Sequence, residues 1–303
     1  SALDGMDRVL VKVPFENTPE TALRLAIVTE LERQFDKGRE RLALLEAERA
    51  VKVLEEDQAA DFTSAPVVIS RTPTNPISLD VPLWETTLQE LALTLRDDPL
   101  IHDAMWKYTL TREEKLFVDT EGSRILHGST NGRLSLFITT TLQDGDDVSL
   151  LRSLDIHDPT EIPDSAALQH WNDEIRTDFY ALIKAPRGKP YSGPVLLSGK
   201  ASGVFFHEVF GHRVEGHRQK LEDEGKTFGD RVGQRILPEY ITIIDDPTLA
   251  SIDGVSLNGY YAYDDEGVAP TPTTLVEGGA FVGFLMVRTP ISGFEESNGH
   301  GRR

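Results

Sequence analysis

Residues 202–218 read SGVFFHEVFGHRVEGHR and gather three histidines and two glutamates in one short stretch. The histidines are His207, His212 and His217, each five residues after the one before. Imidazoles and carboxylates are ligands that zinc takes in catalytic sites. Helical zinc proteases place their two histidine ligands four residues apart, as H-E-x-x-H. The stretch therefore raises the question of a metal site with one additional residue between its histidines.

The five-residue spacing does not suit a regular α-helix. Each residue of an α-helix turns about 100°, so side chains five apart lie about 140° from each other. Two imidazoles so placed cannot share one zinc ion, whose Zn–N distance is about 2.1 Å. A π-bulge would restore a shared face, and Gly211 suits it because glycine bends at little steric cost. We therefore predict a distortion near Gly211 that puts His207 and His212 on one side.

The two glutamates suggest different roles. Glu208 follows the first histidine, where zinc peptidases have a glutamate that takes the proton from a metal-bound water and can hand it to the leaving amine. Glu215 could be a ligand, but a partner that orients His212 is the preferred interpretation. His217 is assigned a capping or surface role, because it lies about 15 Å along a continuous helix from His207.

Large apolar residues around the His–Glu pair predict a buried helix. Polar groups buried among apolar side chains are costly unless they are paired or bound, and this favours a metal. On the residues alone, a metal site and a helix without special chemistry remain even alternatives, because the spacing is not the standard one. The apolar residues are Val204, Phe205, Phe206, Val209 and Phe210.

The composition excludes several classes of partner and site. The 303 residues include 31 basic and 50 acidic side chains, and the net charge of −19 disfavours nucleic acid and anionic membrane surfaces. No cysteine is present, which excludes disulfides and thiolate zinc ligands in these residues. No apolar run approaches the roughly 20 residues of a membrane helix, and the start SALDGMDRVL lacks the pattern of a signal peptide. We predict a cytoplasmic protein.

The hydrophobic periodicity predicts an α+β fold. Helices are expected over about 19–58, after Pro82 and over 165–185, and an antiparallel hairpin is expected to turn at Glu121-Gly122. The Pro- and Gly-rich stretch APRGKPYSGP suggests a boundary near residue 187. We therefore predict an N-terminal α/β domain, 1–187, with long helices and an antiparallel sheet. A mostly β domain, 188–303, would carry the histidine helix. Its expected strands are PVLLSG (short and buried), YITIIDDP, GYYAYD and AFVGFLMVR.

The histidine stretch resembles the TldD/PmbA family of metallopeptidases, also called modulators of DNA gyrase, whose signature is H-E-x-x-x-H. Here the signature runs from His207 through Glu208 to His212. The likeness continues through VGQRILPEYITIIDDPTL, LNGYYAYDDEG, TTLVEGG and SNGHGRR, and covers residues 190–303. A looser likeness extends upstream to TREEKLFVDTEGS.

The resemblance implies a zinc-dependent peptidase that acts on peptides or unfolded protein segments. His207 and His212 would hold the metal, Glu208 would be the general base, and the intact motif is that of a TldD-like, active subunit. Family members assemble as dimers, in some cases of an active subunit with a relative that lacks the motif. A homodimer or such a heterodimer is therefore expected.

One departure from the family concerns the third metal ligand, which is usually a cysteine farther along than residue 303. We expect the sequence to be a truncated portion of the protein. Otherwise another residue substitutes, and the candidates are Asp264, Asp265, Glu266 and His300. The alternative function is a non-catalytic peptide-binding or assembly-partner protein of the same fold.

Overall fold

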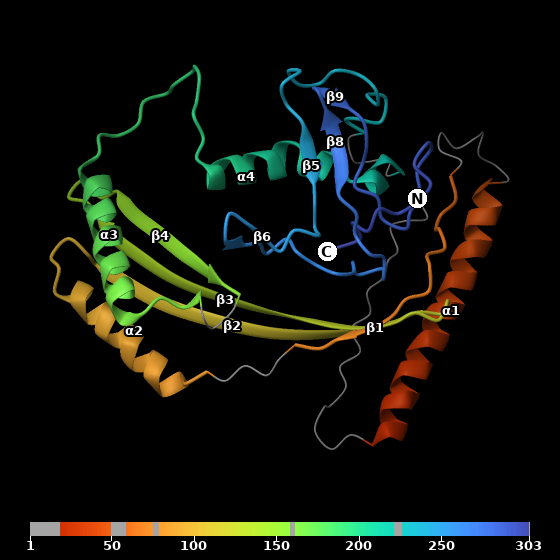
Figure 1. Cartoon of the computed structure of the whole chain (residues 1–303), viewed down its shortest axis with the longest axis horizontal. Helices are drawn as coiled ribbons and strands as arrows, with labels where there is room; N and C mark the ends of the chain where they lie inside the picture. The colour runs from red at the N-terminus through yellow and green to blue at the C-terminus, as the bar shows by residue number, and fades with distance from the viewer. Residues whose placement is uncertain (1–18, 50–58, 75–78, 158–160, 221–225, 303) are drawn as a thin grey trace. The chain divides into compact units, whose positions relative to one another are not determined.

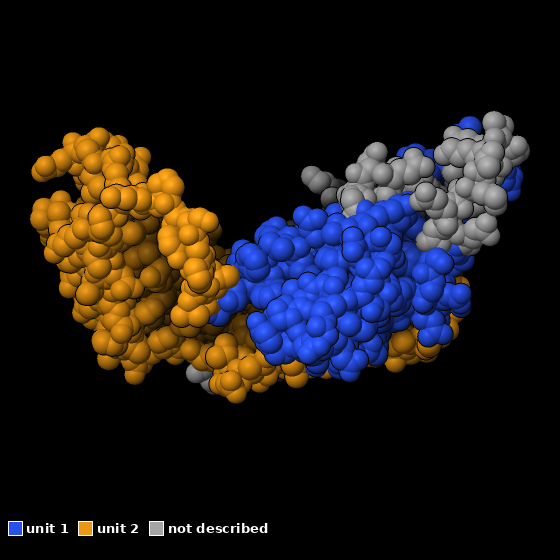
Figure 2. All heavy atoms as spheres, turned by 90° about the horizontal axis from the view of Figure 1, so that it is seen from above, with its two compact units in different colours: residues 1–65, 199–246, 264–303 blue, residues 66–198, 247–263 orange. Residues whose placement is uncertain are grey.

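The computed structural model is a mixed α+β fold, as predicted, and is drawn in Figure 1. It describes residues 19–49, 59–74, 79–157, 161–220 and 226–302. The chain forms two compact units, coloured in Figure 2: unit 1 comprises 1–65, 199–246 and 264–303, and unit 2 comprises 66–198 and 247–263. These units interleave along the chain. The predicted division into 1–187 and 188–303 stays a prediction.

Unit 2 is built on a four-stranded sheet around one long strand. Strands β2 (Asp103–Val118) and β3 (Arg124–Thr141) form the predicted hairpin, in register from Asp103↔Thr139 to Val118↔Arg124. At the turn, Asp119 accepts hydrogen bonds from the backbone N–H groups of Gly122 and Ser123, both 2.8 Å long. The other edge of β3 pairs with β4 (Asp147–Ile156) antiparallel and with β1 (Ile69–Thr72) parallel.

Two helices pack on this sheet and bury its core. Helix α2 (Val81–Arg96) contacts β2, and helix α3 (Ser165–Lys184) contacts β4. Each helix begins at an aspartate, Asp80 or Asp164, whose side chain accepts a backbone N–H of the first turn. Fully buried residues from both helices and the sheet form one core: Leu95, Leu134, Leu136, Ile138, Leu168, Ile175 and Phe179.

Unit 1 contains the histidine stretch and short strands. It includes helix α1 (Glu20–Arg49) and helix α4 (Gly199–Val209), and two 3-10 turns follow α4, η2 (Gly211–Arg213) and η3 (Gly216–Lys220). Strands β5 (Ile243–Asp245), β8 (Thr273–Glu277) and β9 (Ala280–Phe281) form a three-stranded sheet. The hairpin of β6 (Ser251–Ile252) and β7 (Val255–Ser256) belongs to unit 2. None of the described helices has the length and apolar character that a bilayer crossing demands.

Several predicted elements differ from the structure. Helix α1 confirms the expected helix of 19–58 as far as Arg49, and residues 50–58 lie outside the described residues. PVLLSG is neither a strand nor buried, and Leu196 is 99% exposed. GYYAYD is not a strand, and at its last residue the Asp264 carboxylate accepts the N–H groups of Glu266 and Val268 and makes a turn. AFVGFLMVR is a strand only over Ala280–Phe281.

Replacing Asn172 by alanine should destabilise unit 2 by about 2 kcal/mol. The Asn172 side chain is fully buried, accepts the Trp106 indole N–H at 3.2 Å and donates to the Thr94 hydroxyl at 2.9 Å. Its removal leaves the buried indole N–H without an acceptor. Urea unfolding followed by tryptophan fluorescence measures the change, with Asn131→Ala on the exposed part of β3 as the control. Equal unfolding midpoints for both variants would contradict the stabilising role assigned to the buried Asn172 side chain.

Candidate metal centre

The helix that carries His207 ends two residues later. Helix α4 ends at Val209, and the last α-helical hydrogen bond nearby runs from the Phe210 N–H to the Phe206 carbonyl at 3.0 Å. The backbone then tightens into η2, where the Arg213 N–H donates to the Phe210 carbonyl at 2.9 Å. The predicted π-bulge is therefore wrong in form. The helix stops, and a 3-10 turn takes up the additional residue.

The core of unit 1 accounts for the place of this break. Phe210 is 7% exposed and Val214 is fully buried, in a cluster rich in phenylalanine. The Phe210 ring lies 5.6 Å from the Phe228 ring and 6.5 Å from the Phe281 ring, measured between centroids. Backbone hydrogen bonds between Val214, Gly216 and Leu285 fix the segment beyond the turn. Burial of Phe210 and Val214 thus holds the chain where α4 cannot continue.

The break brings the two histidine rings together. The ring centroids of His207 and His212 lie 4.5 Å apart at an interplanar angle of 69°. One potential ligand atom each from His207, Glu208 and His212 can be chosen so that all lie within 4.8 Å of one another. The structure therefore places both imidazoles on one side, with the carboxylate beside them, as predicted.

Glu215 orients the second histidine. Its carboxylate lies 2.8 Å from His212 Nδ1 and accepts the Arg218 Nε–H at 2.6 Å. Burial acts to raise the pKa of Glu215, but the hydrogen bonds from Arg218 and His212 outweigh it and lower the pKa below its ordinary value. A carboxylate beside Nδ1 favours the proton on that nitrogen and leaves Nε2 with its lone pair. His217 lies half-buried, with Nε2 3.7 Å from the same carboxylate.

Arg218 is the residue that the sequence reasoning missed. It follows Glu215 by three residues, a spacing at which side chains meet on a helical turn, and this was the available signal. Its pairing keeps the carboxylate ionised and directed at His212.

The predicted burial of the helix is wrong in this chain. No residue of α4 is buried, and the large apolar side chains before the break, from Val204 to Val209, are between 40% and 63% exposed. His207 and Glu208 are exposed, and His212 is partly buried. Of the apolar residues expected around the site, Phe210 alone enters the core.

The candidates for a third ligand do not join the histidines. Within the described residues, Glu208 is the acidic group that lies with both imidazoles. Asp264 is 2% exposed and accepts backbone N–H groups, including that of Gly301 at 2.8 Å. His300 is held between Asp245, at 3.1 Å, and Asn298, at 2.8 Å. Asp265 and Glu266 are likewise outside the histidine group.

The donor set fits a zinc ion. Zn²⁺ is a borderline-soft ion that accepts both imidazole nitrogens and carboxylate oxygens as ligands. His212 has its Nδ1 engaged by Glu215, which is the outer hydrogen bond that metal-bound histidines usually make. His207 and His212 would hold the ion, and Glu208 would stand beside it.

Comparison with known proteins points to one group of enzymes. Residues 190–303 match the model of the PmbA/TldA metallopeptidase C-terminal domain. The chain is 38% identical over 133 residues to a metalloprotease of Methanocaldococcus jannaschii, a stretch that covers 43% of this chain. It is 30% identical over 141 residues, 45% of this chain, to the TldD homologue metalloprotease of Buchnera aphidicola. The matched stretches span 27% of the length of each of these relatives.

A solved structure from Bacteroides thetaiotaomicron, described as a modulator of DNA gyrase, has a similar fold. It superposes with a TM-score of 0.59 at 15% identity, over 76% of this chain and 50% of the other.

Gly216→Ala should destabilise unit 1 by about 1–3 kcal/mol, whereas Gly211→Ala should be nearly neutral. A Cβ on Gly216 would lie 2.3 Å from the buried Met286 sulfur and 3.3 Å from the Leu285 carbonyl. A Cβ on Gly211 would meet the Phe206 carbonyl at 3.7 Å, an ordinary contact. Thermal unfolding of the two variants measures the difference. A Gly211→Ala variant as unstable as Gly216→Ala would contradict the described turn.

Proposed function

The chain belongs to the TldD/PmbA family of metallopeptidases through residues 190–303, and we propose that it is a zinc-dependent peptidase. In this proposal His207 and His212 hold the metal, and Glu208 is the general base. The observation that carries it is the approach of the two imidazoles, 4.5 Å between ring centroids, with a Glu208 carboxylate oxygen within 4.8 Å of a ring nitrogen of each.

The positions of the residues support the proposed roles. Zinc bound there would supply a Lewis acid that polarises a carbonyl and makes water more acidic. Glu208 is exposed, so its carboxylate can reach an attacking water and accept its proton. The same group can deliver that proton to the leaving amine as the peptide bond breaks. Glu215, fixed by Arg218, holds the His212 ring so that Nε2 is presented.

The proposed substrates are peptides or unfolded protein segments, because the exposed His207–Glu208 pair is open to an extended chain. The net charge of −19 disfavours nucleic acid as a partner and is compatible with the cytoplasm. We also propose a dimer, with an identical copy or a family relative. Large apolar side chains on α1 support an assembly, because 62% of Leu31 and 68% of Phe35 are exposed.

A second candidate function is a non-catalytic peptide-binding or assembly-partner protein of the same fold. The observation that favours it is the ligand count. A catalytic zinc normally has three protein ligands and an open position. Among the described residues, two histidines and the carboxylate assigned as the base are the groups at the site.

Glu208→Gln should lower kcat for peptide cleavage by about 10²–10⁴-fold while zinc binding is kept. Glutamine has nearly the same shape but cannot accept the proton. The measurement is hydrolysis of a fluorogenic peptide by the zinc-loaded protein, with zinc content determined in parallel. Glu295→Gln, at an exposed glutamate away from the histidines, is the matched control. Undiminished cleavage by Glu208→Gln would remove Glu208 as the base. Absence of cleavage by the zinc-loaded wild-type protein would instead favour the non-catalytic alternative.

Glu215→Ala should weaken zinc binding by about 10- to 100-fold. Its loss frees the His212 ring and leaves Arg218 without this carboxylate. Competition with a chromogenic chelator measures the affinity directly, independently of any cleavage. Glu295→Ala again serves as the control. Equal affinities of Glu215→Ala and wild type would show that the Glu215 contact does not serve the metal.

A further inference from the structure

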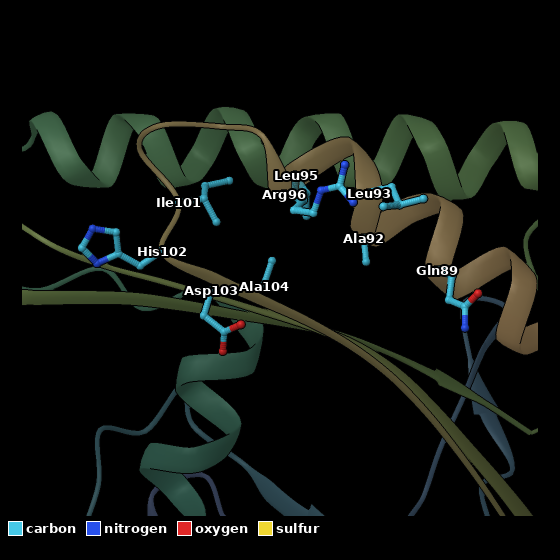
Figure 3. Close-up of a pocket in the computed structure, with 9 residues that line it drawn as sticks. All are labelled: Gln89, Ala92, Leu93, Leu95, Arg96, Ile101, His102, Asp103 and Ala104. Carbon is cyan, nitrogen blue, oxygen red and sulfur yellow. The ribbon is translucent and has the colours of Figure 1, made fainter.

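A cavity of about 380 Å³ lies in unit 2, between the second half of α2 and the start of β2. Its walls include Ala92, Leu93 and Leu95 from α2, Ile101 from the connecting loop and Ala104 from β2. Figure 3 shows these side chains between the helix and the strand. Leu95 and Ile101 are buried, whereas Leu93 is 49% exposed at the mouth. The cavity is therefore an open, mainly apolar recess of a size typical of ligand sites.

The cavity opens beside an unpaired edge of the sheet. Strand β2 pairs with β3 along its whole length, and no residue of β3 lines the cavity. Within the part of the chain that the structure describes, no strand pairs with the other edge of β2. Alternate residues of such an edge direct their N–H and C=O groups outward. The groove between α2 and this edge, here the α2–β2 groove, thus combines a row of backbone hydrogen-bonding groups with an apolar recess.

The charges at the mouth restrict the ligand. Arg96 is paired with Asp97, Nε to Oδ1 at 3.1 Å. His102 accepts the Thr141 N–H on Nδ1 at 3.2 Å, which directs its Nδ1 away from a ligand. Asp103, also at the cavity, is exposed and contributes a negative charge. An anionic ligand is therefore disfavoured, and a neutral or basic one is accepted.

We propose that the α2–β2 groove binds an extended polypeptide segment as an added strand on β2, with one large apolar side chain in the cavity. Backbone groups are the natural partners of an unpaired strand edge, and a neighbouring recess selects one side chain of the added strand. The ligand is a segment without acidic residues near its apolar side chain. This site lies in unit 2, needs no metal, and goes beyond the function proposed for the histidines in unit 1.

The test measures binding of a fluorescein-labelled, end-capped peptide KTVTFTVTK to the whole chain by anisotropy. Leu93→Ala should weaken binding about fivefold, because it removes apolar wall from the cavity, and Leu93→Lys should weaken it further. Leu83→Ala, which removes a 60% exposed leucine elsewhere on α2, should leave binding unchanged. Replacing the peptide phenylalanine by serine, or N-methylating alternate peptide bonds, should abolish binding.

Hydrogen exchange locates the added strand. Bound peptide should slow exchange at the start of β2, near Asp103–Ala104, and a chelator should not affect binding. Failure of the metal centre would therefore leave this result intact. No binding at millimolar peptide, equal binding by Leu93→Ala and wild type, or equal binding of the N-methylated peptide would overturn the proposal. Pairing of β2 with a second copy of the chain that the peptide cannot displace would also overturn it.

Discussion

Burial of Phe210 and Val214 is the constraint on which the histidine site depends. A phenylalanine or valine side chain gains about 1.5–3 kcal/mol on full burial, and both of these residues enter the phenylalanine-rich core of unit 1. A continuous helix would turn His212 about 140° from His207. Anchoring the chain at Phe210 and Val214 instead ends α4 at Val209 and brings the two rings to 4.5 Å between centroids. The site is thus a consequence of core packing directly beyond a helix end.

Polar contacts then fix what packing brings together. Glu215 accepts from Arg218 and faces His212 Nδ1, and the backbone at Val214 and Gly216 is bonded to Leu285. Gly216 is required there because the Met286 sulfur occupies the space a side chain would need. The contacts of Glu215 with His212 and Arg218 are local in sequence, whereas those of Val214 and Gly216 are with the distant segment around Leu285. The orientation of one imidazole therefore depends on residues about seventy positions away.

Sequence patterns predicted those features of the fold that depend on residues close together in the chain. The hairpin of β2 and β3 followed from its alternation and from the turn at Glu121-Gly122. The spacing of His207, Glu208 and His212 left a metal site and a helix without special chemistry as even alternatives, and the resemblance to the family favoured the metal site. The way the chain breaks did not follow from such patterns, because it depends on the distant partners Phe228 and Phe281. The apolar run before His207 predicted burial, but period and composition do not say what covers a helix, and in this chain Val204 is 63% exposed. GYYAYD is rich in strand-forming residues, yet the Asp264 side chain binds the backbone and makes a turn.

The proposed function depends on His207 and His212 holding one metal ion at the end of α4. X-ray absorption at the zinc edge of the zinc-loaded protein tests it most directly, because imidazole ligands have a distinct multiple-scattering signature. The account predicts two imidazole nitrogens at about 2.0–2.1 Å from zinc, and the loss of one of them in His212→Ala. A zinc spectrum without imidazole scattering, or one that is the same in wild type and in the His207→Ala/His212→Ala double variant, would contradict it.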